Sequence, residues 1–572
     1  MAYFLKKTTN KKGEYLQIYE SFHDPNRGYA AHRAYKPIGY VHELKASGIE
    51  DPISYFKKEA ENLNLQLKRS KQQDKIKLIS DESPERFLGY FPIKNIHDSL
   101  GVKGHLNLLQ KLYNFDFNVY EVLSSLIYAR MIHPCSKHKT FHDVLPKLFE
   151  PFEFSLNQLY ITCEFLGTEY EKVIQIYNNF IQKKYTFDTS TTYFDCTNFY
   201  FEIDQEDQLR RKGPSKENRK DPIVGMGLLL DANQIPIGMK IFPGNESEQP
   251  IFRDVITSLK QSQNIEGRTI RIADKGLNSA LNIIHAREQG DGYIFSKSVK
   301  KLPAIEKQWV LLANDYQEVC DSKGKVLYHI KECIDEFPYA ITLENGKKKT
   351  IKLKEKRVVI YNPKLAKKQN LEIQRQVEKA KTLRASQAKR DEYGDSAKFV
   401  IFESTDTSGK TTEGKVKVSL NEKAITEAKI LAGYNLIVTS EVKLSAKTIY
   451  DTYHNLWRIE ESFKIMKSEL EARPAFMQRE STIIGHFLIC YLSVVMMRLL
   501  QFRILNNNYS SEDIIGFIKN FKTVKVSSNQ YINISKSTDF IKDLTKQTGL
   551  PLNVYYLNNS QIKEVLSHRF EA

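Results

Sequence analysis

TTYFDCTNFYFE (residues 191–202) decides the fold: it is a run of β-branched and aromatic residues with one carboxylate, Asp195, at its centre. Such side chains are typical of strands, because they pack well on a pleated surface. Further apolar runs follow it, separated by turn residues and by two helical patterns. We predict strands at 190–202, 222–231, 235–243, 268–274 and 291–298, with helices near 249–262 and 278–288.

Two more acidic positions stand out along the chain. Asp274 ends the apolar run TIRIA, and Glu460 lies in the helical stretch YHNLWRIEESFKIMKSEL (453–470). Parallel strands present functional groups at their ends, so Asp195 and Asp274 can converge. Carboxylates are the ligands that Mg²⁺ prefers, and two such ions roughly 4 Å apart can clamp a phosphodiester. A lone Asp in a strand is more often a turn or cap ligand, so the argument depends on the three together.

With these stretches around Asp195, Asp274 and Glu460, the chain resembles a DDE-type insertion-sequence transposase, of the branch named after insertion sequence four. The resemblance implies a ribonuclease-H-like catalytic core, an α/β fold with a mixed sheet flanked by helices and interrupted by a β-rich insertion. It also implies two Mg²⁺ ions, which Mn²⁺ is expected to replace. It spans roughly residues 190–500, and five stretches carry it: YFDCTNFYFE, GPSKENRKDPIVGMGLLLD with IPIGMKIFPGNESE, RIADKGLNSALNI, YHNLWRIEESFKIMKSELEARPAF and IIGHFLICYL.

The branch has a Tyr-Arg-Glu-Lys signature that matches Tyr453, Glu460 and Lys467. Their seven-residue spacing predicts one shared face on a continuous helix. The signature selects Glu460 over Glu461 as metal ligand beside Asp195 and Asp274, and it implies that Tyr453 and Lys467 contact DNA. An ordinary helix face is the plain alternative for these two. The signature's arginine would fall at Leu456, which departs from the pattern; Arg458 is nearby but is predicted to point elsewhere.

Other DNA contacts are implied by the resemblance. Lys216 and Arg219 lie in the loop RRKGPSKENRKDP, which in isolation would be a solvent loop but which relatives place beside the active site. Relatives also stack an aromatic side chain on a flipped base, a contact worth about 1–3 kcal/mol. Trp309 is the better candidate for this role, whereas Trp457 is expected to pack in the core.

The chain is too long for one core, so several domains are expected. Between 346 and 390 there are 16 Lys or Arg against 3 Glu, which indicates either a solvated helix face or a surface that follows DNA phosphates. We predict a β-hairpin and linker helix at 1–80, a helical and potentially DNA-binding region at 81–185, a catalytic core at 186–300 and 431–505, a basic β-rich insertion at 301–430, and a C-terminal region at 506–572.

Charge and composition agree with a nucleic-acid partner. The net charge is +16 and the pI about 9.1, although charge alone is equally compatible with a basic protein that binds no DNA. Six cysteines without a CxxC pair argue against a zinc module or a disulfide framework. The apolar run Ile483–Met497 is shorter than the ~20 residues of a membrane span, so a buried core helix is expected.

Three hypotheses follow. The first is a transposase, expected in the prokaryotic cytoplasm in association with the nucleoid, that binds terminal inverted repeats as a homodimer, cleaves the ends and joins them to target DNA. The second is a ribonuclease-H-like nuclease that does not transpose. The third is a domesticated DNA-binding protein without catalysis, which the intact Asp195, Asp274 and Glu460 argue against.

Overall fold

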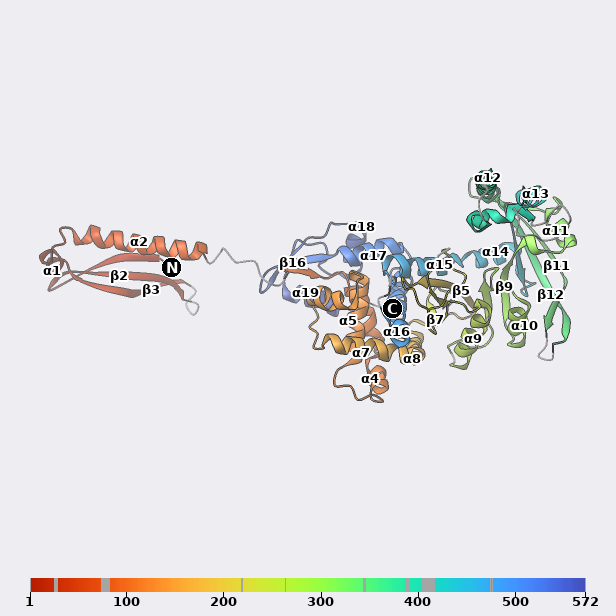
Figure 1. Cartoon of the computed structure of the whole chain (residues 1–572). Helices are drawn as coiled ribbons and strands as arrows, with labels where there is room; N and C mark the ends of the chain where they lie inside the picture. The colour runs from red at the N-terminus through yellow and green to blue at the C-terminus, as the bar shows by residue number, and fades with distance from the viewer. Residues whose placement is uncertain are drawn as a thin grey trace. The chain divides into compact units, whose positions relative to one another are not determined.

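The computed structural model describes residues 2–24, 29–73, 83–217, 220–262, 264–342, 346–385, 390–403, 417–473, 475 and 477–570. The chain divides into two compact units, Met1–Ser83 and Pro84–Ala572. Figure 1 shows the elements of both units along the chain.

The first unit is a three-stranded antiparallel sheet with two helices. Strands β1 and β2 form a hairpin, β3 extends the sheet, and the long helix α2 follows. Leu16 and Ile18 on β2 are fully buried, as is Ala60 on α2, because the helix packs on this sheet. The sequence also predicts a turn at Pro25 and Asn26, and these two residues lie outside the described part of the chain. The elements are β1 (Ala2–Asn10), β2 (Gly13–Asp24), β3 (Tyr29–Tyr40), α1 (Val41–Ala46) and α2 (Pro52–Gln73).

The centre of the second unit is a nine-stranded sheet in the order β10-β11-β12-β15-β9-β8-β5-β6-β7. Strands β5, β8 and β9 are parallel, whereas β6 and β7 continue from β5 as antiparallel hairpins. This is the order of a ribonuclease-H-like core, and it confirms the α/β fold predicted from sequence. The strands are β5 (Thr191–Tyr200), β6 (Ile223–Leu230), β7 (Pro236–Pro243), β8 (Ile270–Ala273), β9 (Gly292–Lys297), β10 (Gln317–Cys320), β11 (Val326–Thr342), β12 (Lys348–Tyr361) and β15 (Tyr434–Thr439).

The inserted segment extends this same sheet. Strand β15 pairs antiparallel with β9 on one side and with β12 on the other. The basic run of the sequence covers β12 and the helix after it, α12. Figure 1 shows α12 near α13, and α12 also contacts β14 of a small two-stranded sheet. These elements are α11 (Ala304–Leu311), α12 (Pro363–Ala385), β13 (Val400–Glu403), β14 (Lys417–Leu420) and α13 (Glu422–Ile430).

Helices cover the part of the sheet that carries Asp195. The helices α9 and α10 pack beside each other against it, and α14 and α15 also contact it, lying above the strands in the view of Figure 1. Phe252 of α9 stacks on Phe194 of β5 with ring centroids 4.8 Å apart, which fixes the helix next to the strand that carries Asp195. The bounds are α9 (Glu248–Gln261), α10 (Ala280–Glu288), α14 (Ala446–His454) and α15 (Trp457–Lys464).

The predicted helical region is present and packs with the C-terminal segment. Strand β16 of that segment pairs with β4, which precedes the first helix of the region. The elements are β4 (Glu85–Phe87), α3 (Phe91–Leu100), α4 (Lys103–Gln110), α5 (Val119–Ile132), α6 (Lys137–Lys139), α7 (Leu156–Thr168), α8 (Tyr170–Tyr185), α17 (Ser511–Asn520), β16 (Lys522–Ser527), β17 (Gln530–Asn533), α18 (Asp539–Thr548), β18 (Tyr556–Leu557) and α19 (Asn559–Ser567).

The most apolar helix, α16 (Glu480–Leu499), is buried as predicted. The segment Glu480–Ile504 is long and apolar enough to cross a membrane by composition, but 94% of its apolar window lies inside the protein. Its approach to α7 requires glycine: a Cβ on Gly167 would lie 1.7 Å from the Ser481 carbonyl oxygen, and one on Gly485 would lie 1.9 Å from that of Cys163. A central core helix explains this hydrophobicity.

His97 of α3 makes stability depend on pH. It is fully buried, with Nε2 2.6 Å from the Tyr177 hydroxyl and Nδ1 3.2 Å from the Tyr128 hydroxyl. Burial lowers the pKa of His97 to about 4. An unfolded His titrates near pH 6.5, so neutral, buried His97 contributes fully to the free energy of unfolding above pH 6.5. That free energy falls by roughly 3 kcal/mol as the pH falls from 6.5 to 4.

We therefore expect the stability advantage of wild type over His97→Gln to shrink between pH 6.5 and 4. Denaturant unfolding at a series of pH values measures it. His133→Gln, at an exposed position, is the control and should show no such trend. A wild-type advantage that stays constant across this window would contradict the assignment.

Candidate active site

The register of the sheet brings Asp195 and Asp274 together. Phe194 of β5 is opposite Ala273, the last residue of the parallel strand β8, so the next residues are Asp195 on β5 and Asp274 directly after β8. Adjacent strands lie about 4.8 Å apart. Burial raises the pKa of Asp195 to about 6; Lys216 opposes this rise, while Glu248 and Asp274 add to it. The two carboxylates therefore share one partly buried site.

A lysine and a third carboxylate lie at this site. The Lys216 Nζ lies 3.7 Å from Asp195 Oδ1 and 3.4 Å from Glu248 Oε1, and it also donates to the Cys196 carbonyl. Burial alone would lower the pKa of Lys216, but the two carboxylates raise it above its ordinary value. One ammonium group thus lies between two acidic side chains.

Glu248 was not among the residues predicted from the sequence. It begins α9, directly after the N-cap Ser247, and it belongs to the stretch PGNESE that carries part of the resemblance. A glutamate in the first turn of a helix is commonly explained by the helix dipole alone. No spacing links it to Asp195, because only the packing of α9 on the sheet brings the two together.

Tyr453 contacts one of the two aspartates, whereas Lys467 pairs with a glutamate of the loop that carries Lys216. The Tyr453 hydroxyl donates to Asp274 Oδ1 at 3.0 Å, and burial followed by the charge of Asp274 raises the pKa of the phenol. Lys467 Nζ lies 3.2 Å from Glu217 Oε1, while burial lowers the pKa of this lysine. Tyr453 thus positions one predicted metal ligand directly.

Glu460 lies elsewhere. It is exposed and lines a cavity of about 620 Å³ with Trp457, Lys464 and Ser511. The face predicted for Tyr453, Glu460 and Lys467 is wrong, because the helix is not continuous: α14 ends before Asn455, α15 begins afterwards, and a π-helical turn follows at Ile465–Glu469. In the described part of the chain, no group of three His, Cys, Asp or Glu side chains could hold a metal ion.

The other predicted contacts are spread over the second unit. Arg458 pairs with Glu461 at 3.0 Å and lies 3.9 Å from the centre of the Trp457 ring. Trp457 is 41% exposed, so its predicted place in the core is wrong. Trp309 of α11 is half-buried, with the Lys331 ammonium 5.0 Å from its ring. Arg219 lies outside the described residues.

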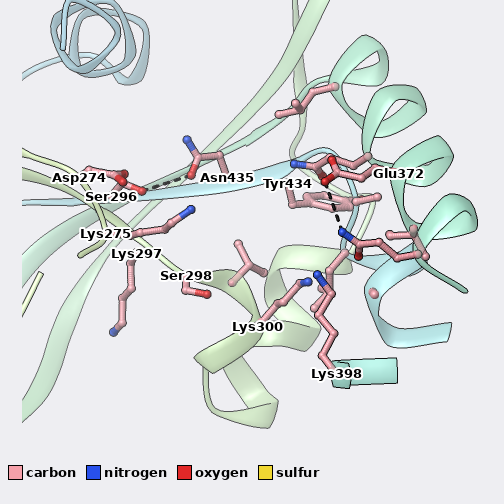
Figure 2. A pocket seen from close by; sticks show the side chains of 18 of the residues that line it. Asp274, Lys275, Ser296, Lys297, Ser298, Lys300, Glu372, Lys398, Tyr434 and Asn435 are labelled. Carbon is pink, nitrogen blue, oxygen red and sulfur yellow. Dashed lines mark hydrogen bonds between the residues drawn. The ribbon is translucent and has the colours of Figure 1, made fainter. Parts of the chain in front are cut away.

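A lysine-rich cavity adjoins Asp274. It has a volume of about 480 Å³ and extends from Asp274 and Tyr453 to α12. Figure 2 shows Lys300 and Lys398 with their ends side by side and Lys275 pointing into the same space. Burial lowers the pKa of Lys300, and the nearby Lys398 lowers it further. The cavity therefore offers an anionic ligand a positively charged wall next to one of the predicted catalytic residues.

The donor set suits a divalent cation. Asp195 and Asp274 each supply carboxylate oxygens, the donors that Mg²⁺ and Mn²⁺ prefer, whereas Glu248 faces Asp195 across Lys216 and does not form a cluster of three with them. The ammonium of Lys216 already occupies a position between two of them, which shows that this place attracts positive charge. Asp195 and Asp274 are therefore the residues best placed to hold a metal, with Glu248 beside them.

Comparisons with known proteins found a family model and a solved structure that are similar to this chain. A family model described as "Transposase DDE domain" matches residues 189–494, which is more than half of the chain. The chain is also similar to a solved structure described as "Cryo-EM structure of piggyBac transposase synaptic complex with hairpin DNA". The identity is 8% and the TM-score 0.36, over 75% of this chain and 79% of that one. No curated protein matches the sequence.

Proposed function

The chain belongs to the family of transposases that share the DDE domain, and from that premise we propose how it acts. It binds the terminal inverted repeats of an insertion sequence, cleaves the DNA at both ends and transfers the 3′ ends to target DNA. The observation that supports this most is the position of Asp195 on β5 next to the end of the parallel strand β8, which Asp274 directly follows. Because two ends are cut together, we propose a homodimer on DNA.

The family generally uses divalent metal ions. We propose that Asp195 and Asp274 hold two Mg²⁺ ions, or Mn²⁺ in their place. When bound, the ions supply Lewis-acid stabilisation of the charge that develops on the phosphodiester. Tyr453 holds Asp274 in one orientation through its hydroxyl hydrogen bond. Lys216 balances the carboxylate charge before the metal binds, and it then becomes free to contact a DNA phosphate.

Two glutamates are proposed to complete the metal site. The family signature supports Glu460, whereas position in the structure supports Glu248. Glu248 shares Lys216 with Asp195, and its negative charge raises the pKa of that aspartate. We propose that Glu248 ligates from the outset, with Glu460 joining the same site when DNA is bound.

Replacing Glu248 by Gln is expected to weaken Mn²⁺ binding about 10-fold or more, because one anionic donor is lost beside Asp195. Isothermal titration of the DNA-free protein with Mn²⁺ measures this. The matched control is Glu246→Gln, two residues earlier and exposed in the same loop. Equal Mn²⁺ affinities for the two variants would remove Glu248 from the metal site.

The lysine-lined cavity supports a path for the DNA. We propose that a strand leaving Asp274 passes Lys275 and Lys300 towards the basic face of α12. Neutralising phosphates with lysines releases counterions and makes binding depend on salt. The remaining proposed contacts are Tyr453, Lys467, Lys216, Arg219, Arg458 and Trp309.

One experiment separates the three hypotheses. Purified protein is incubated with labelled DNA that carries the terminal repeats of its element, in Mg²⁺ or in EDTA. Metal-dependent cleavage at the repeat boundary is the expected result. Indiscriminate cutting of any DNA would instead favour a plain nuclease, and tight end binding without cleavage in either solution would favour a domesticated binder.

A further inference from the structure

A small cavity lies among the helices of the second unit, apart from the carboxylates. Its volume is about 100 Å³, enough for one tetrahedral anion. It is lined by the end of α5, the start of α6, α7, α16 and the segment before α16. The lining residues with charged or aromatic polar side chains are Arg130, Lys137, Tyr160, Glu471, Arg473 and His486.

Lys137 is the unusual member. It is 3% exposed, and within the described residues no hydrogen bond or ion pair reaches its ammonium. Burying an unpaired ammonium is unfavourable by several kcal/mol, so such groups are normally paired. Lys137 instead faces the cavity.

The surroundings do not compensate this charge. Arg130, 5% exposed, donates to the carbonyl oxygens of Leu470 and Cys135, which are neutral acceptors. Burial, together with the smaller effect of the nearby Arg130, lowers the pKa of Lys137 to about 8. Glu471, the one carboxylate of the described lining, is exposed to solvent.

His486 adds a further polar group to the cavity wall. Its Nε2 is 3.1 Å from the Ala472 carbonyl oxygen, whereas its Nδ1 is buried without a hydrogen-bond partner. The cavity thus contains unpartnered polar atoms from two separate elements, with an excess of positive charge. An anion that also carries a hydroxyl, such as monohydrogen phosphate, can accept from Lys137 and donate to His486.

We propose that this cavity is a binding site for a phosphate group, held by Lys137 with Arg130 and Arg473. Free phosphate and a phosphate of the DNA backbone both present anionic oxygens to Lys137 and the arginines, and only free phosphate also carries a hydroxyl that can donate to His486. The backbone source is favoured by position: Arg473 also pairs with Glu217, which is adjacent to Lys216 in the loop beside Asp195. This assignment of the source, but not phosphate binding itself, depends on the proposed function.

The first test uses inorganic phosphate and the full chain without DNA. Wild type is expected to unfold about 2 °C or more higher in saturating phosphate, because the ligand binds only the folded state. Lys137→Met is expected to unfold at a higher temperature than wild type in phosphate-free buffer and to gain nothing from phosphate. The matched control is Lys139→Met, an exposed lysine of the same short helix, which should respond like wild type.

The proposal is overturned if Lys137→Met gains as much from phosphate as wild type does, or if wild type gains nothing. The second test is binding of terminal-repeat DNA over a salt series. Loss of about one unit from the slope of log affinity against log salt in Lys137→Met identifies a backbone phosphate as the occupant. If the slope of Lys137→Met is unchanged while phosphate still stabilises wild type and not this variant, the occupant is free phosphate. A protein that passes the first test but cleaves no DNA would contradict the proposed function only.

Discussion

Replacing Asp195 by Asn is expected to abolish Mg²⁺-dependent cleavage of terminal-repeat DNA while leaving binding of that DNA measurable. The substitution removes one anionic oxygen donor from the centre of the site at nearly constant volume. Metal ions contribute several kcal/mol of transition-state stabilisation, so the expected loss in rate is about 1,000-fold or more. Single-turnover cleavage of labelled DNA measures the rate, and fluorescence anisotropy measures the binding.

The control for this experiment is Glu318→Gln, an exposed carboxylate on strand β10 of the same sheet. It should cleave like wild type. Glu460→Gln, tested in parallel, is expected to lose cleavage as Asp195→Asn does, since we propose that it joins the site with DNA bound. Cleavage by Asp195→Asn at the wild-type rate would exclude the proposed catalytic site.

The second large effect is on stability. Asp291→Ala is expected to destabilise the second unit by about 3–5 kcal/mol, because it leaves the Arg271 guanidinium buried without its carboxylate. Both side chains are fully buried, with Arg271 Nη2 2.5 Å from Asp291 Oδ2. Asp291 also pairs with Lys260 at 2.6 Å and accepts from the Thr269 backbone N–H at 3.1 Å. Denaturant unfolding followed by fluorescence measures the change.

An exposed ion pair provides the comparison. Lys447 and Asp451 of α14 lie 2.7 Å apart with side chains 63% and 53% exposed. Asp451→Ala should cost less than about 1 kcal/mol, since solvent screens such pairs. If both substitutions cost the same, burial would not determine the strength of the Arg271–Asp291 pair. Arg271 lies on β8 three residues before Asp274, so the result also reports on how firmly that aspartate is held.

The core of the fold was predictable because its signals are local. Alternation and apolar runs identify the five central strands, and the strand around Asp195 is long enough to be unambiguous. The order of strands and helices then fixes the parallel pairing that brings Asp274 next to Asp195. The burial of α16 in the core was predictable in the same way, because its sequence is an uninterrupted apolar run.

The rest depended on tertiary packing. The spacing of Tyr453, Glu460 and Lys467 implies a common face only along an unbroken helix, and one interruption together with one π-helical turn changes the direction of each side chain. Glu248 was missed because its neighbour Asp195 is distant in sequence. The exposure of Trp457 follows from the same helix break and from its contact with Arg458.

The continuity of the nine-stranded sheet bears on how this protein can be dissected. The predicted domain boundary at residue 300 suggests that the inserted segment could be deleted as an independent domain. Strand β15, however, has hydrogen-bonded neighbours on both sides, β9 and β12. Excision of 301–430 would leave β15 with one row of backbone amides and carbonyls unpaired, an open edge that recruits strands from other molecules. A shortened chain should therefore self-associate, so truncation is a poor way to assign the insertion's role, and point substitutions on its surface are the sounder route.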